Sequence, residues 1–202
     1  MSQIPSKIDP KMQRSVTQYI NDLHDVHSKL LAIRVDLGYR KEHAGTVELS
    51  DIKRDVKRML DNRRNNSIFE HQVGYICKFE NTPEKGIHAH TLFLFDGQQV
   101  QKDSYRADAV GEYWTEQITE GKGVFHNCNR DKDKYQRCGI GMIKHSDVEK
   151  RQNLLDHVVP YLLKTDQSIE GIRQSGREKS ITKGIVPNVK SSSGRPRSKK
   201  AE

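Results

Sequence analysis

The spacing of apolar residues divides most of the chain into alternating helices and strands. From Pro10 to about Val26 apolar residues recur at helical spacing, which predicts an amphipathic helix. The run Leu30–Gly38 is apolar and partly β-branched, which favours a central strand that ends at its glycine. A second amphipathic helix follows, with Ser50 as its expected N-cap and the segment 65–67 as its end.

Further along the chain, the pattern predicts a hairpin followed by another helix and strand. The hairpin strands span Val73 to Phe79 and Ile87 to Phe95, and a turn containing proline and glycine joins them. A helix is expected over about 103–118. The strand expected over 137–144 contains two glycines, which are typical of places where another backbone or a ligand comes close.

The last periodic segment predicts a helix that contains a proline. Ser146 and Glu149 form a capping-box pattern that opens this helix. Pro160 is expected to kink or restart it, and the helix then continues from Tyr161 to about Asp166. Beyond about residue 172 no periodicity persists, and part of the composition is typical of a linker.

This order of elements predicts an α+β fold of the split-βαβ kind. A strand, a helix and then paired strands favour an antiparallel sheet of roughly four to five strands with flanking helices. We divide the chain into an N-terminal helix packed on the core (1–27), a main domain (28–172) and a basic, flexible tail (173–202).

The composition indicates a protein with much water-exposed surface. Apolar residues make up 33% of the chain and the mean hydropathy is −0.86. No apolar run approaches the length of a membrane span, and the N-terminus lacks the apolar core of a signal peptide, so we expect a cytosolic protein. The three cysteines share no C-x-x-C spacing, which argues against a disulfide framework or a zinc ribbon and indicates reduced thiols.

Positive charge is concentrated at the C-terminal end. The chain carries a net charge of +8, and residues 173–202 contain nine Lys or Arg but only two acidic residues. Such a tail suits the binding of DNA, and it could equally be a solubilising end. Gly194–Arg197 resembles the core of an AT-hook, which lays arginines into an A·T minor groove; a disordered basic end is the alternative. The predicted DNA-binding residues are Arg173, Arg177, Lys179, Arg195 and Arg197.

The second hairpin strand carries candidate metal ligands. His88 and His90 are two positions apart, so both imidazoles leave the same face of a strand. Glu80 ends the first hairpin strand, and antiparallel pairing can bring its carboxylate beside them. Two imidazoles and one carboxylate are three ligands for a divalent cation. The alternative is a pair of polar residues on the wet face of a half-buried strand.

A second candidate group lies on the last helix. Tyr161 and Lys164 are three positions apart, so their side chains are neighbours on a helix. An ammonium group beside a phenol favours the phenolate and can hold a phosphate oxygen. Facing a metal site, this pair could cut a phosphodiester through a covalent phosphotyrosine. The alternative is an aromatic residue at a helix–sheet interface, with the lysine in solvent.

These motifs together resemble the HUH endonuclease superfamily, and more narrowly its single-tyrosine rolling-circle replication initiators. The resemblance rests on Glu80 at a strand end, on Ile-His-Ala-His-Thr-Leu-Phe-Leu-Phe at 87–95 and on Tyr-Leu-Leu-Lys at 161–164. The segments 137–142 and 159–167 are similar to inovirus-type and prophage-borne proteins of the YagK/YfjJ C-terminal-domain family.

The resemblance implies an RRM-like sheet, a Mg or Mn ion, and nicking of one DNA strand at an origin. His88, His90 and Glu80 would be the metal ligands, with Glu84 and Glu70 as other candidates for the third position. The DNA would be the origin of a phage, satellite or plasmid in the cytoplasm of a bacterial host.

In the same scheme Tyr161 is the nucleophile, and its attack leaves a 5′-phosphotyrosine on this residue. Lys164 orients the phosphate or neutralises its charge. His157, one turn earlier, is either an assisting base or an interface histidine. The chain contains no Walker motif, so unwinding would need a host helicase, and synthesis a host polymerase. A transposase or relaxase-like strand transferase, and a DNA-binding regulator of the same fold without catalysis, are the alternative functions.

Overall fold

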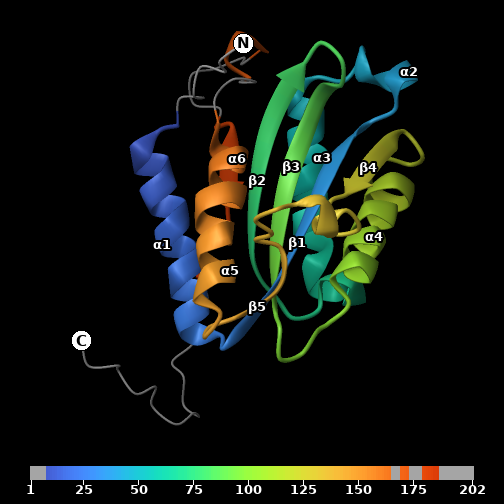
Figure 1. The fold of residues 1–202 in the computed structure, drawn as a ribbon. Coiled ribbons are helices and arrows are strands. Elements are labelled where there is room, and N and C mark those ends of the chain that lie inside the picture. The colour runs from blue at the N-terminus through green and yellow to red at the C-terminus, as the bar shows by residue number, and fades with distance from the viewer. Residues whose placement is uncertain (1–7, 165–168, 173–178, 187–202) are drawn as a thin grey trace.

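The computed structural model describes residues 8–164, 169–172 and 179–186, which form an antiparallel sheet with helices on both faces (Figure 1). The predicted α+β class is confirmed, and the sheet has six strands instead of four or five. The strands are β1 (Lys29–Tyr39), β2 (Gln72–Thr82), β3 (Gly86–Asp96), β4 (Gly123–Asn127), β5 (Gly141–Lys144) and β6 (Ile181–Lys183). The helices are α1 (Pro10–Val26), α2 (Lys41–Ala44), α3 (Leu49–Asn62), α4 (Asp103–Tyr113), α5 (Val148–Asn153) and α6 (Val159–Leu163).

The strand order is that of a split βαβ fold with two added strands. The order is β4-β1-β3-β2-β6, and β5 also pairs with β1, beside the part of β1 that precedes its pairing with β4. The connection β1–α3–β2 leaves a place for β3 between its strands, and β3–α4–β4 passes over β1. Strands β4 and β6 and helix α2 were not predicted. Strand β6 lies within the range assigned to the basic tail and pairs with β2.

Two helices are capped close to the predicted residues but not at them. Helix α3 is capped by Glu48, and the Asp51 carboxylate accepts a hydrogen bond from the Glu48 backbone N–H at 2.9 Å, so the Ser50 prediction is wrong. Helix α5 is capped by Asp147 and not by Ser146. At α5, Ser146 and Asp147 stand side by side and both residue types are good caps, so the sequence does not decide between them.

The last helix passes through Pro160 without ending. A π-helical turn at Leu154–Val158 joins α5 to α6, and Pro160 lies in the first turn of α6. Proline has no backbone N–H to donate, and the π-helical turn just before it interrupts the regular i→i−4 hydrogen bonding at the same place. Helix α6 ends at Leu163, three residues before the predicted end, and Lys164 continues with extended backbone.

Each face of the sheet packs against its own set of helices (Figure 1). Helices α3 and α4 cover one face, where Ile52, Val56 and Val110 pack against alternate residues of β1 and β3. Helices α1, α5 and α6 cover part of the other face, where Ile20 and Leu162 join a second core. The strand residues of the first core include Leu31, Ile33, Val35, Leu37, Ala89, Phe93 and Phe95, and those of the second include Leu30, Ala32, Ile76, Leu92 and Leu94.

Among the described helices, none is both long enough and apolar enough to cross a bilayer. Cys77, Cys128 and Cys138 are free, and burial raises the pKa of the Cys128 thiol to about 11.

Candidate metal and tyrosine site

The face of the sheet under α1, α5 and α6 changes from apolar to polar along three neighbouring strands. At one end it is lined by alternate apolar residues, which are Leu30 and Ala32 of β1, Leu92 and Leu94 of β3, and Ile76 of β2. At the other end the same alternation continues with polar residues, which are Arg34 and Asp36 of β1, His88 and His90 of β3, and Lys78 and Glu80 of β2. Because side chains alternate with period two, all of these residues point to one side.

The register between strands brings the predicted ligands together. Glu80 of β2 lies directly opposite His88 of β3, and Asp36 of β1 lies directly opposite His90. Residues that face each other across an antiparallel pair have Cβ atoms about 5 Å apart, within reach of side-chain contact. The hairpin therefore delivers the carboxylate to the two imidazoles, as the sequence predicts, and the central strand delivers a second carboxylate.

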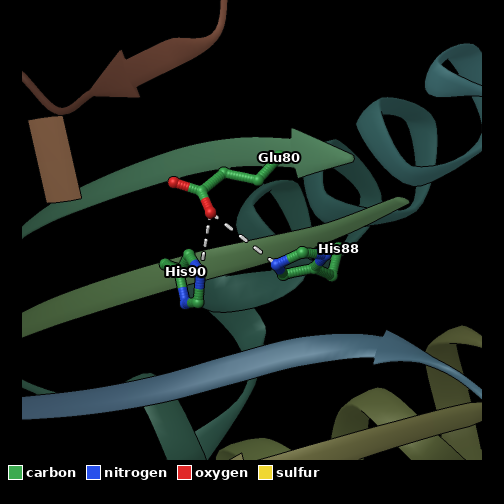
Figure 2. A group of neighbouring side chains, drawn as sticks. All are labelled: Glu80, His88 and His90. Atoms are coloured by element: carbon green, nitrogen blue, oxygen red, sulfur yellow. Dashed lines mark ion pairs between the residues drawn. The ribbon is translucent and has the colours of Figure 1, made fainter. Parts of the chain in front are cut away.

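Both imidazoles point their Nε2 atoms toward the same carboxylate oxygen (Figure 2). The Oε2 atom of Glu80 is 3.2 Å from His90 Nε2 and 3.8 Å from His88 Nε2. One candidate ligand atom from each of the three residues lies within 4.8 Å of the others, and all three side chains are buried. Of the carboxylates considered, Glu80 is the one grouped with the histidines, while Glu84 is exposed and Glu70 lies beside His71.

A second contact on each ring fixes which nitrogen is free to bind a cation. His88 Nδ1 is 2.9 Å from the carbonyl oxygen of Gly86, and His90 Nδ1 is 2.7 Å from Asp36 Oδ1. When Nδ1–H donates to these oxygens, the lone pair of each ring is on Nε2, the atom that faces Glu80. Such outer contacts are what orients histidine ligands in metal sites.

The electrostatics of the two histidines differ. Burial lowers the pKa of His88, which favours the neutral ring that a cation requires. Burial acts in the same direction on His90, but hydrogen bonds with Asp36 and Glu80 outweigh it and raise its pKa. For Asp36, burial acts to raise the pKa, and the hydrogen bond to His90 and the charge of Arg34 more than offset it, so the pKa is lowered.

The donor set fits a divalent cation. Both carboxylate oxygens of Glu80 are buried, and Oε2 is the oxygen that faces the two imidazoles. A fully buried carboxylate is costly, and a cation bound between it and two neutral imidazoles would offset that cost. Two neutral imidazoles and one carboxylate are common ligands of divalent metals and leave coordination positions open. Glu80, His88 and His90 are therefore a candidate metal site.

Tyr161 lies against this group. Its ring is in edge-to-face contact with His90, with 5.6 Å between ring centroids, and 38% of the residue is exposed. The guanidinium carbon of Arg34 lies 4.2 Å from the centre of the Tyr161 ring, and Lys164 Nζ lies 4.6 Å from it. The late helix thus carries its phenol to the histidines, and Lys164 is beside that phenol although it lies just past the helix end.

Sequence reasoning missed Arg34 and Asp36. They interrupt the run Leu30–Gly38, which reads as a wholly apolar central strand. The signal that could have found them is their spacing, because two charged residues two positions apart in a buried strand must share one face. Their link to His90 and Tyr161 depends on the pairing of β1 with β3, which is not evident from the sequence.

One of the five predicted tail residues lies among the residues that the structure describes. Lys179 is described and exposed. The other four, Arg173, Arg177, Arg195 and Arg197, lie outside the described residues, as does the Gly194–Arg197 segment that resembles an AT-hook. Their role in DNA binding stays a prediction.

A known protein family matches the part of the chain that contains the candidate metal ligands. The model of the YagK/YfjJ C-terminal domain family matches residues 8–121. The chain belongs to this family. The YagK/YfjJ match covers α1 through α4 with Glu80, His88 and His90, and it ends before Tyr161 and Lys164. No curated protein and no solved structure matches the chain.

Proposed function

We propose that this YagK/YfjJ-family protein nicks and rejoins single-stranded DNA through a covalent 5′-phosphotyrosine and so initiates rolling-circle replication of a phage, satellite or plasmid. The observation that carries the proposal is the contact of a partly exposed tyrosine, Tyr161, with a buried Glu-His-His group. A tyrosine packed against candidate metal ligands and flanked by two cations has the parts that phosphodiester transesterification needs.

The proposed reaction exchanges one phosphate ester for another. The Tyr161 oxygen forms a bond to the phosphorus of the scissile phosphate while the bond from phosphorus to the 3′ oxygen breaks. The phenol loses its proton to solvent, which reaches the ring, and the 3′ oxygen takes up a proton to become a hydroxyl. Rejoining is the reverse step, in which a 3′-hydroxyl attacks the phosphotyrosine and releases the phenol. No net oxidation or hydrolysis is required.

Charged side chains around the phenol favour this step. Arg34 and Lys164 both lie over the Tyr161 ring, where their positive charge would stabilise negative charge that develops in the transition state. The same two groups can donate hydrogen bonds to the non-bridging oxygens of a phosphate. Glu80, His88 and His90 would hold a divalent cation, which would supply further positive charge to those oxygens.

The ligands favour manganese over magnesium. Two of the three donors are imidazole nitrogens, whereas Mg²⁺ is bound mainly through oxygen and keeps most of its waters. Mn²⁺ accepts mixed nitrogen and oxygen ligands more readily. We therefore expect Mn²⁺ to support the reaction at lower concentration than Mg²⁺. The proposed macromolecular partners are origin DNA and, for unwinding and synthesis, a host helicase and polymerase.

The proposal is tested by trapping the covalent intermediate. The full chain is incubated with single-stranded DNA from its own replicon and Mn²⁺, and adducts are separated on a denaturing gel. We expect an adduct that is absent with chelator and absent in Tyr161→Phe. The matched control is Tyr105→Phe, because Tyr105 is an exposed tyrosine on α4, which covers the opposite face of the sheet. An adduct that persists in Tyr161→Phe would assign the nucleophile to another residue, and no adduct on any strand would refute nicking.

A further inference from the structure

A hollow of about 420 Å³ lies beside Tyr161. It is bounded by β1, by the segment between β4 and β5, and by the π-helical turn that leads into α6. Its lining includes Arg34, Lys85, Tyr135, Arg137, His157 and Tyr161. The volume lies within the range of small-ligand sites, about 300 to 1,000 Å³.

We propose that this hollow is a nucleotide subsite, which holds one nucleotide of a single DNA strand next to the phosphate that Tyr161 attacks. The inference rests on the proposed function for its position relative to the cut. The binding of a nucleotide in the hollow can nevertheless be measured without any cleavage.

The inner wall of the hollow contains an arginine suited to a phosphate. Arg34 is only 9% exposed, and its Nη2 lies 3.3 Å from both carboxylate oxygens of Asp36. Its Nε is buried and donates to no acceptor among the described residues. A buried donor without an acceptor is costly, and a guanidinium edge matches the oxygens of a phosphate. Asp36 thus holds one side of the guanidinium, and Arg34 lines the hollow beside Tyr161, where a phosphate would meet it.

The rim of the hollow carries groups suited to a base. Tyr135 is 40% exposed, and Arg137 Nη1 lies 3.3 Å from His157 Nε2, which places a guanidinium and an imidazole side by side. Aromatic rings and guanidinium planes stack on nucleobases, which present an open face only where the strand is single. Lys85 adds a further exposed positive charge. Among the described residues of the lining, Asp36 is the one acidic residue, and it is already paired with Arg34 and His90.

The rim is held at a fixed position relative to Tyr161. A Cβ atom added to Gly139 would lie 2.4 Å from the backbone nitrogen of Leu154, so the segment that carries Tyr135 and Arg137 packs backbone to backbone against the last helix. Asn129, at the start of the same segment, accepts a hydrogen bond from the Arg34 backbone N–H at 2.8 Å. A base bound at this rim and a phosphate bound at Arg34 would therefore have a defined distance to the phenol.

The test measures binding and cleavage separately in the full chain. The probe for binding is a fluorescein-labelled oligothymidylate about twelve nucleotides long, followed by anisotropy at physiological salt. The variants are Tyr135→Ala and Arg137→Ala. The matched controls, Tyr105→Ala and Arg54→Ala, remove an exposed tyrosine and an exposed arginine from α4 and α3 on the opposite face. We expect Tyr135→Ala to weaken binding roughly 5- to 100-fold, the range that loss of one base stack gives, while the controls bind like the native protein.

The cleavage arm uses the replicon strand that gives the covalent adduct, with an abasic site placed on either side of the cut. With the native protein, we expect one of these two abasic strands to react more slowly than the intact strand. With Tyr135→Ala, that abasic strand and the intact strand should react equally fast, because the base and its stacking partner act as a pair. Native-like binding by both pocket variants would overturn the subsite. Weakened binding without any adduct would support the subsite and refute nicking, and normal binding with a normal adduct would leave nicking intact and refute the subsite.

Discussion

The two faces of the sheet use the same strands for different purposes. Under α3 and α4, the inward residues of β1 and β3 are apolar from Leu31 to Leu37 and from Ala89 to Phe95, except for Thr91, whose hydroxyl donates to the Val35 carbonyl oxygen. On the opposite face they are apolar only at the end covered by α1, α5 and α6, and beyond Ala32 and Leu92 they become charged or titratable. Because neighbouring residues of a strand face opposite sides, each central strand supports a core with one set of residues and the candidate site with the other.

This difference predicts opposite responses to substitution on one strand. Phe93 is buried on the α3–α4 face of β3, and Phe93→Ala should lower the free energy of unfolding by about 3–5 kcal/mol, because it leaves a cavity in an apolar core. Chemical denaturation followed by circular dichroism measures this change. Phe93→Leu keeps most of the volume and should lose less stability. If either variant still folds, its affinity for Mn²⁺ should equal that of the native protein, and a large loss of affinity would show that the two faces are not independent.

The complementary change is Glu80→Gln on the polar part of the other face. It removes a metal ligand and its charge, so Mn²⁺ affinity should fall by about 100-fold or more, and Mn²⁺ should no longer raise the melting temperature. Without metal the variant should be about as stable as the native protein, because an amide of the same shape can still accept from His90 and does not carry the cost of a buried charge. Titration calorimetry and thermal unfolding with and without Mn²⁺ measure both effects. A matched control is Glu84→Gln, since Glu84 is exposed.

The same comparison explains how much the sequence could predict. Glu80, His88 and His90 were found because they belong to one hairpin, in which alternation and a short turn determine the neighbours. Tyr161 was found from its helical spacing to Lys164. By contrast, Arg34 and Asp36 meet His90 and Tyr161 through pairing of β1 with β3, two strands far apart in the chain. The strands β4 and β6 were missed because five and three residues are too few to show a period of two.

Arg34 tests whether the polar end of the face does chemistry or only packs. Arg34→Gln should slow formation of the DNA adduct by roughly 100-fold, because it removes the buried positive charge over the Tyr161 ring. Arg34→Lys should retain part of the rate, since it keeps the charge but not the planar donor edge. Adduct formation is timed on denaturing gels at saturating DNA. Equal rates in all three proteins would mean that Arg34 only fills space beside the tyrosine.

Asp36 gives the smallest expected effect and separates orientation of a ligand from direct binding. It contacts His90 Nδ1 at 2.7 Å and so holds Nε2 toward Glu80. Asp36→Ala should weaken Mn²⁺ binding about 10- to 100-fold, as loss of an outer contact does in other metal sites. Asp36→Asn keeps an acceptor oxygen and should recover part of that loss. Asp131→Asn is the control, because Asp131 lies 3.6 Å from His126 outside the candidate ligand set.

Asp36 also holds Arg34, so two different measurements are needed to separate the loss of the His90 contact from the loss of the Arg34 contact. Loss of the His90 contact should appear as weaker Mn²⁺ binding in the absence of DNA. Loss of the Arg34 contact should appear as slower adduct formation when Mn²⁺ is saturating. If Asp36→Ala slows the adduct at saturating Mn²⁺ but leaves Mn²⁺ affinity unchanged, Asp36 acts through Arg34 alone. In that case β2 and β3 alone would form the metal site on this face, and β1 would contribute only through Arg34.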